Sequence, residues 1–137
     1  MAYDLERFVA EQDGSYETVL DELRRWRKTS HWIWFIFPQI AGLGRSAMSQ
    51  HFAIGSLDEA RAYLAHFLLG GRLRECTRLV LAIEGRTAEE IFGSLDAMKV
   101  RSSMTLFHRA APHEREFGLV LERYYGGVED EATVERL

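Results

Sequence analysis

Apolar side chains recur at the spacing of an α-helix along nearly the whole chain. The clearest stripes lie in residues 5–9, 16–26, 57–68, 73–83 and 117–124. Two sequences of the capping-box type, from Ser56 to Glu59 and from Thr87 to Glu90, mark helix starts. The pattern predicts an all-α protein, a compact single-domain bundle of about seven to nine short helices over residues 1–137.

One uninterrupted apolar run stands apart from these stripes. Residues 32–37 read Trp-Ile-Trp-Phe-Ile-Phe, which fits either a buried strand or a buried helical turn. We interpret the run as helix, because strand signals are weak in the rest of the chain. Pro38 sets its end, since a proline pushes the preceding residue away from the α region. Gly42 and Gly44 then belong to a tight loop that enters the next helix, and a lone Gly-x-Gly is a weak signal for phosphate.

Composition excludes several classes of protein. The chain has 137 residues, 47% of them hydrophobic, and 17 Lys and Arg against 21 Asp and Glu give a net charge of −4. This balance excludes a disordered chain and a generally basic nucleic-acid binder. The single cysteine, Cys76, excludes a disulfide framework and a Cys-rich zinc site. The N-terminal region is acidic, unlike a signal peptide, and no apolar run reaches the roughly 20 residues of a membrane span, so we expect a cytoplasmic protein.

Acidic residues are missing from two long windows of the chain. Residues 23–57 and 97–113 contain no Asp or Glu, and Lys28 and Lys99 lie in one window each. If the fold brings the windows together, they create a local positive field in a net-negative protein. Such a field suits a small anion such as a phosphate. The alternatives are solvated helix faces and a nucleic-acid groove.

The first window contains one group of candidate ligand-binding residues. The lysine supplies a charge, the serine is placed to cap the following turn, a tryptophan offers a stacking face for a base, and the glutamine supplies a buried amide. The alternative is that the aromatic residues only form core. The candidates are Lys28, Ser30, His31, Trp32 or Trp34, and Gln39.

The second window contains a polar stripe on a helix predicted over residues 94–107. Lys99, Ser102 and Ser103 fall at positions i, i+3 and i+4, and therefore share one face. One lysine and two hydroxyls flanked by Met98 and Met104 are unusual for a solvent face. We interpret them as the second wall of the ligand site, and the alternative is that the hydroxyls bind neighbouring backbone carbonyls.

Catalytic and metal-binding signals are weaker. Glu84 ends an apolar run, where partial desolvation would raise its pKa and suit it to general acid–base work, and the alternative is a helix-end acid facing Arg86. Glu84 and Asp96 are the first candidates for a catalytic carboxylate. The five histidines form no H-x-x-x-H pair and no carboxylate–histidine motif, so we expect no metal and no cofactor. Cys76 lies on an apolar stripe and is interpreted as a core thiol.

Four strings together resemble a bacterial family. They are Arg-Lys-Thr-Ser-His-Trp-Ile-Trp-Phe-Ile-Phe-Pro-Gln at 27–39, Gly-Leu-Gly at 42–44, Ile-Phe-Gly at 91–93 and Arg-Ser-Ser-Met-Thr-Leu-Phe at 101–107. Over nearly its whole length the chain resembles the domain of unknown function 1810, which implies a mainly α-helical single domain and no established activity. Some members carry the label calpastatin. Calpastatins are disordered and Pro-rich, whereas this chain has two prolines and many aromatic residues, so we reject that function.

A more distant resemblance is to the NADAR (YbiA-like) family of helical N-glycosidases, which act on riboflavin intermediates or ADP-ribosylated bases. It rests on a late Lys-x-x-x-x-Met helix followed by an aromatic residue, here Lys99, Met104 and Phe107. The Glu-His segment of that family has no counterpart, since Ser30 precedes His31. The resemblance therefore transfers no catalytic acid.

Two functions remain. The first is a pocket for a small phosphorylated or nucleotide-like ligand, walled by the groups around Lys28 and Lys99, for which N-glycoside hydrolysis is the reaction considered. It requires the two lysines on the same side of the molecule. The alternative is a non-catalytic interaction domain that docks an acidic partner through a cationic surface, and it requires an exposed Trp or Phe among arginines. Whether the protein is an enzyme stays open at this point.

Overall fold

The computed structural model describes residues 3–137, and every named element in this part of the chain is a helix. The helices are α1 Glu6–Asp13, α2 Tyr16–Arg24, α3 Ile33–Ile36, α4 Ala47–His51, α5 Leu57–Ala65, α6 Leu69–Ala82, α7 Ala88–Phe92, α8 Ser94–Ala110, α9 Arg115–Tyr125 and α10 Glu131–Val134. The all-α class is confirmed. The ten helices described exceed the expected number because several, such as α3 and α10, are single turns of four residues.

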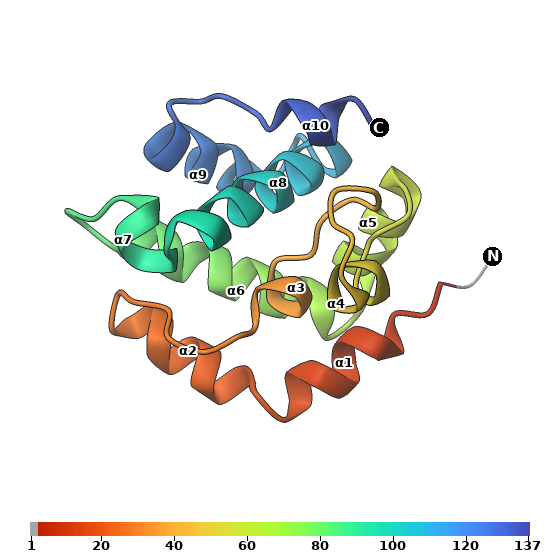
Figure 1. Ribbon diagram of the computed structural model, residues 1–137, viewed down its shortest axis with the longest axis horizontal. Coiled ribbons are helices and arrows are strands. Elements are labelled where there is room, and N and C mark those ends of the chain that lie inside the picture. The colour runs from red at the N-terminus through yellow and green to blue at the C-terminus, as the bar shows by residue number, and fades with distance from the viewer. Residues whose placement is uncertain (1–2) are drawn as a thin grey trace.

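The two longest helices form the centre of the bundle. The 14-residue α6 packs against α2, α5 and α9, and the 17-residue α8 packs against α5, α7, α9 and α10. In Figure 1, α6 runs between α2 below it and α8 and α9 above it. Leu73, Cys76 and Val80, from the stripe predicted for this helix, are buried on α6. None of the described helices combines the length and the apolar character that a membrane crossing requires.

Side-chain caps form where the sequence places them, with one rearrangement. Thr87 and Glu90 make both hydrogen bonds of a capping box at the start of α7. Ser56 caps α5, but the carboxylate of Glu59 does not complete the box. Its Oε1 accepts a hydrogen bond from the N–H of Gly55, one residue before the cap, at 2.8 Å, and its Oε2 binds Arg7 on α1 at 3.0 Å.

The aromatic run and the chain after it form one wall of the candidate site described below. Residues 33–36 form the single turn α3, as interpreted, and Phe35 and Phe37 are buried in the core. The carbonyl of Gln39 accepts a hydrogen bond from the N–H of Ile54, and the N–H of Ala41 donates to the carbonyl of Ile54, each at 2.8 Å. This pairing holds Gln39 and the loop after it in place.

Candidate functional site

The two lysines of the chain converge on one carboxylate. Nζ of Lys28, in the loop after α2, lies 2.6 Å from Oδ2 of Asp96, and Nζ of Lys99 on α8 lies 3.1 Å from Oδ1. The Lys28 side chain is 6% exposed and that of Lys99 is 27% exposed. Burial tends to raise the pKa of Asp96, but the hydrogen bonds and charges of the lysines outweigh burial and lower the pKa. The two acid-free windows therefore meet, with a carboxylate between them.

A second buried carboxylate holds the loop that carries Lys28. Glu22 on α2 accepts hydrogen bonds from the N–H groups of Thr29 (2.7 Å) and Ser30 (2.9 Å), from the Ser30 hydroxyl (2.5 Å) and from Nε1 of Trp32 (2.9 Å). Burial tends to raise the pKa of Glu22, but these bonds outweigh it and lower the pKa to about 2. The expectation that Ser30 caps α3 is wrong, because its hydroxyl is bound to Glu22.

A cavity of about 280 Å³ lies beside Lys99. The indole of Trp34 lies against the ammonium of this lysine, with Nζ 4.5 Å from the ring centroid, as in a cation–π contact. Apolar side chains with a few convergent polar groups are the usual lining of a small-molecule site. The lining residues are Trp34, Gln39, Leu43, Leu95, Met98, Lys99, Ser102, Asp130 and Ala132.

Gln39 contributes the most informative atom of this lining. Its side chain is the expected buried amide, with the residue only 6% exposed. Nε2 is buried and has no hydrogen-bond acceptor among the described residues. A buried donor without an acceptor costs about 1–3 kcal/mol. Gln39 is therefore a lining residue whose amide nitrogen the described part of the chain leaves unpaired.

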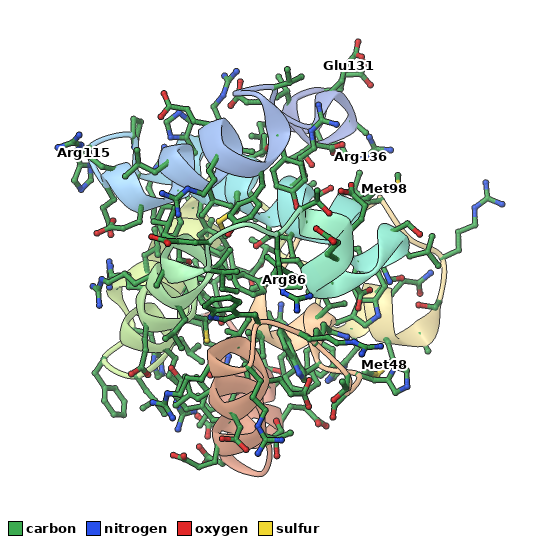
Figure 2. All side chains as sticks on the ribbon, turned by 90° about the vertical axis from the view of Figure 1, so that its left-hand side faces the viewer. Met48, Arg86, Met98, Arg115, Glu131 and Arg136 are labelled. Carbon is green, nitrogen blue, oxygen red and sulfur yellow. The ribbon has the colours of Figure 1, made fainter. Side chains whose placement is uncertain are left out.

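The sequence analysis missed the carboxylate that lines the cavity. Asp130 caps α10 through Oδ2, which accepts hydrogen bonds from the N–H (3.0 Å) and the hydroxyl (2.6 Å) of Thr133. The chain then continues to Arg136, whose Nη2 donates to the carbonyl of Gly42 at 3.2 Å. This bond ties the C-terminal segment to the loop that carries Leu43. Figure 2 shows Arg136 and Met98 on the same side of the molecule.

Several expected ligand-binding residues lie outside the cavity lining. Trp32 is buried in the core, where its indole N–H donates to Glu22, and the exposed His31 does not line the cavity beside Lys99. Successive residues on a helix are about 100° apart, so Ser102 lines the cavity while Ser103 is fully buried. The Ser102 hydroxyl also donates to the carbonyl of Met98 at 3.2 Å, as the alternative interpretation required. Those outside the lining are Lys28, Ser30, His31, Trp32 and Ser103.

The two candidate catalytic carboxylates differ in position. Glu84 is exposed and lines a separate cavity with Arg86, so the expected desolvation is wrong. The reason is that α6 ends at Ala82 and the chain turns away from the core. Asp96 is beside the site, but its two oxygens bind Lys28 and Lys99 and it does not line the cavity. Within residues 3–137 no group of three or more His, Cys, Asp or Glu side chains is placed to hold a metal ion.

A larger cavity of about 430 Å³ lies between the end of α8 and α9. Its ionisable side chains are those of His108, Arg115, Glu122 and Glu129. A bidentate contact at 2.7 Å holds Glu129 to Arg109. Nδ1 of His108 also lacks a partner among the described residues, but this side chain is only half-buried. The smaller cavity is the better candidate, because its unpartnered amide belongs to a residue almost wholly removed from solvent.

Comparison with known proteins agrees with the helical architecture. The chain is similar to the crystal structure of the conserved hypothetical protein Rv1873 from Mycobacterium tuberculosis, with 52% sequence identity and a TM-score of 0.97. That alignment covers 98% of this chain and 96% of the other. No protein of curated function matches. The family model described as protein of unknown function (DUF1810) matches residues 2–137, and the chain therefore belongs to the DUF1810 family.

Proposed function

We propose that the cavity beside Lys99 binds a small phosphorylated or nucleotide-like ligand. The observation that carries the proposal is the amide of Gln39, a buried donor in the lining with no acceptor in the described part of the chain. A ring nitrogen, a carbonyl or a phosphate oxygen of such a ligand supplies that acceptor. A ligand without an acceptor leaves the amide unsatisfied, at a cost of about 1–3 kcal/mol.

The remaining lining supports a planar ring joined to an anionic group. Trp34 is half-buried, so part of its indole is available for stacking, and Leu43 and Met98 supply apolar surface. Lys99 supplies the positive charge. A ligand anion can draw Lys99 from Asp96 without leaving a buried carboxylate unpaired, because Lys28 stays bound to Asp96 at 2.6 Å.

The proposal includes hydrolysis of an N-glycosidic bond, with the carboxylate of Asp130 as the general base. In this step a water oxygen attacks the anomeric carbon, the carbon–nitrogen bond breaks, and its electron pair leaves with the base. Asp130 accepts the proton of the attacking water and later returns it to solvent, and the leaving base takes up one proton from a solvent water, so that one water is consumed overall. Support for this role is that Asp130 lines the cavity, while Glu84 and Asp96 do not.

The first experiment is a thermal-shift screen with AMP, ADP-ribose, NAD and riboflavin phosphate as probes. A probe at a hundred times its dissociation constant adds roughly 2.7 kcal/mol of stability. For a chain of this size the expected rise in melting temperature is on the order of 10 °C. Any probe that gives such a shift is then incubated with the protein, and release of the free base is measured by chromatography.

Matched variants decide whether a shift arises in this cavity. Lys99→Met and Gln39→Leu keep the approximate side-chain size and are expected to abolish the shift. Arg78→Met, which removes an exposed cation from α6, is the control and is expected to keep it. A screen without any shift, or a shift that both cavity variants retain, contradicts the proposed ligand class. For hydrolysis, Asp130→Asn preserves the helix cap and is expected to abolish base release while the ligand still binds.

A further inference from the structure

Trp26 has an unusual backbone conformation. At the end of α2 its N–H donates to the carbonyl of Leu23, and the N–H of Arg27 donates to the carbonyl of Glu22, each at 3.1 Å. This pair of bonds is a Schellman motif, whose turning residue has a positive φ and is usually glycine. Trp26 has a φ of 65° and is the one non-glycine residue with positive φ in residues 3–137. Tryptophan therefore occupies a position that glycine adopts more easily.

The chain after Trp26 is held firmly, so this conformation cannot relax. The N–H of Lys28 donates to the carbonyl of Ile91 on α7 at 2.7 Å, and its ammonium binds Asp96. The next residues are bound through their N–H groups to the buried carboxylate of Glu22. In Figure 1 the end of α2 lies at the left edge of the molecule, below α7. Strained conformations of this kind persist only where the surroundings impose them, and here they fix the indole at the surface.

The side chain of Trp26 is 43% exposed and its chain neighbours are cationic. Arg24, Arg25 and Arg27 are all exposed. Among the salt bridges of the described residues, only the one from Arg25 to Asp21, at 3.5 Å between exposed side chains, involves these arginines. Contacts of that kind are weak. Trp and Arg are the residue types most enriched at the energetic centres of protein interfaces.

We propose that the Trp26 patch, residues 24–27, docks a short acidic segment of another protein. In this arrangement the indole packs against an apolar side chain of the segment, and the guanidinium groups bind the carboxylates on either side of it. This function is separate from ligand binding at Lys99.

The charge of the whole chain favours a short acidic segment over an extended polyanion. The net charge is −4, and acidic residues crowd the chain before the patch. A nucleic acid or an anionic membrane presents negative charge over a wide area, and would therefore also meet this acidic surface. A segment of a few residues meets only the arginines and the indole.

The test measures binding of a fluorescent peptide with a central leucine–phenylalanine pair flanked by glutamates. Fluorescence anisotropy with the full chain is expected to show binding, and Trp26→Gly is expected to weaken it about tenfold or more. Glycine suits the Schellman position and offsets part of the packing that is lost with the partly buried indole, so this variant is expected to stay folded, which its thermal melting curve checks. Loss of binding by a folded variant is the signature of a docking residue.

Controls separate this surface from general charge attraction. Phe67→Ala removes another exposed aromatic residue, 91% exposed in the loop before α6, and is expected to leave binding unchanged. A peptide with glutamine in place of glutamate is expected not to bind. The proposal is overturned if the acidic peptide fails to bind at millimolar concentration or binds Trp26→Gly equally well. Tighter binding of an oligothymidylate or of phosphatidylserine vesicles than of the peptide overturns it as well.

Discussion

Replacing Glu22 by glutamine is expected to destabilise the fold by about 3 kcal/mol at neutral pH. Glu22 is only 7% exposed, and its carboxylate accepts four hydrogen bonds from the loop after α2. The pKa of this group falls from 4.5 to about 2, and each pKa unit corresponds to about 1.4 kcal/mol. Glutamine has the same shape, but its NH₂ group replaces one carboxylate oxygen and is itself a donor. The backbone, hydroxyl and indole donors that face this oxygen therefore lose their acceptor.

The same carboxylate makes stability depend on pH. Its pKa in the folded protein lies below the value in the unfolded chain, so its contribution is complete above about pH 4.5 and is lost as the pH falls toward about 2. Glutamine does not titrate. The difference in unfolding free energy between the natural chain and Glu22→Gln therefore shrinks across this range.

Urea unfolding followed by far-UV circular dichroism measures this difference, at neutral pH and at several values between about pH 5 and 2. Glu17→Gln is the control, because Glu17 is exposed on the same helix, and it is expected to change stability by less than about 0.5 kcal/mol. A loss below about 1 kcal/mol for Glu22→Gln at neutral pH contradicts the account of the buried carboxylate. A difference that stays constant with pH would refute it as well.

Three further predictions concern the cavity and its supports. Amine-directed acetylation, mapped by mass spectrometry, is expected to modify Lys99 well before Lys28, because their side chains are 27% and 6% exposed; equal rates contradict the burial of Lys28. Gly44→Ala is expected to cost about 1–3 kcal/mol in urea unfolding, because a Cβ there lies 2.7 Å from Cβ and Oγ of Ser49; an unchanged midpoint contradicts this packing. Asp130→Ala is expected to cost about 1 kcal/mol in the same assay through loss of the α10 cap, whereas Asp130→Asn is expected to be neutral; equal costs contradict the capping role.

The helices could be predicted because their signals are local. Thr87 and Glu90 lie three residues apart in the first turn of one helix, both are exposed, and each binds the other's backbone N–H. At Ser56 the local signal is only half fulfilled, because the carboxylate of Glu59 binds the N–H of Gly55 and the guanidinium of Arg7 and not the N–H of Ser56. The Arg7 guanidinium comes from α1, 52 residues before Glu59 in the sequence. A contact of this kind cannot be derived from spacing along the chain.

The candidate site was predicted only in part, because some of its residues carry a local signal in the sequence and others do not. The absence of acids in two windows indicated that Lys28 and Lys99 belong together, and both bind one carboxylate. Glu22 and Asp96 are the acids that contact residues of the two acid-free windows. Each stands one residue before its window in the sequence, so an analysis limited to the windows overlooks them. Asp130 is the N-cap of α10. Its place in the cavity depends on the packing of α10 against α8, which no local pattern encodes.

Lys28 and Lys99 bind Asp96 at different distances, and this difference explains how a cavity beside a carboxylate can still attract an anion. Lys28 is nearly buried and closest to Asp96, so its ammonium satisfies the carboxylate that burial would otherwise make costly. Lys99 adds a second positive charge at a longer distance and with more exposure, against the face of Trp34. The two ammonium groups outnumber the single carboxylate of Asp96 by one positive charge, and Lys99 presents that charge to the cavity, whose lining also holds the carboxylate of Asp130. Asp96 therefore acts in the proposed site as the group that holds Lys28 and positions Lys99, and the anion-binding capacity of the cavity depends on a lysine that does not line it.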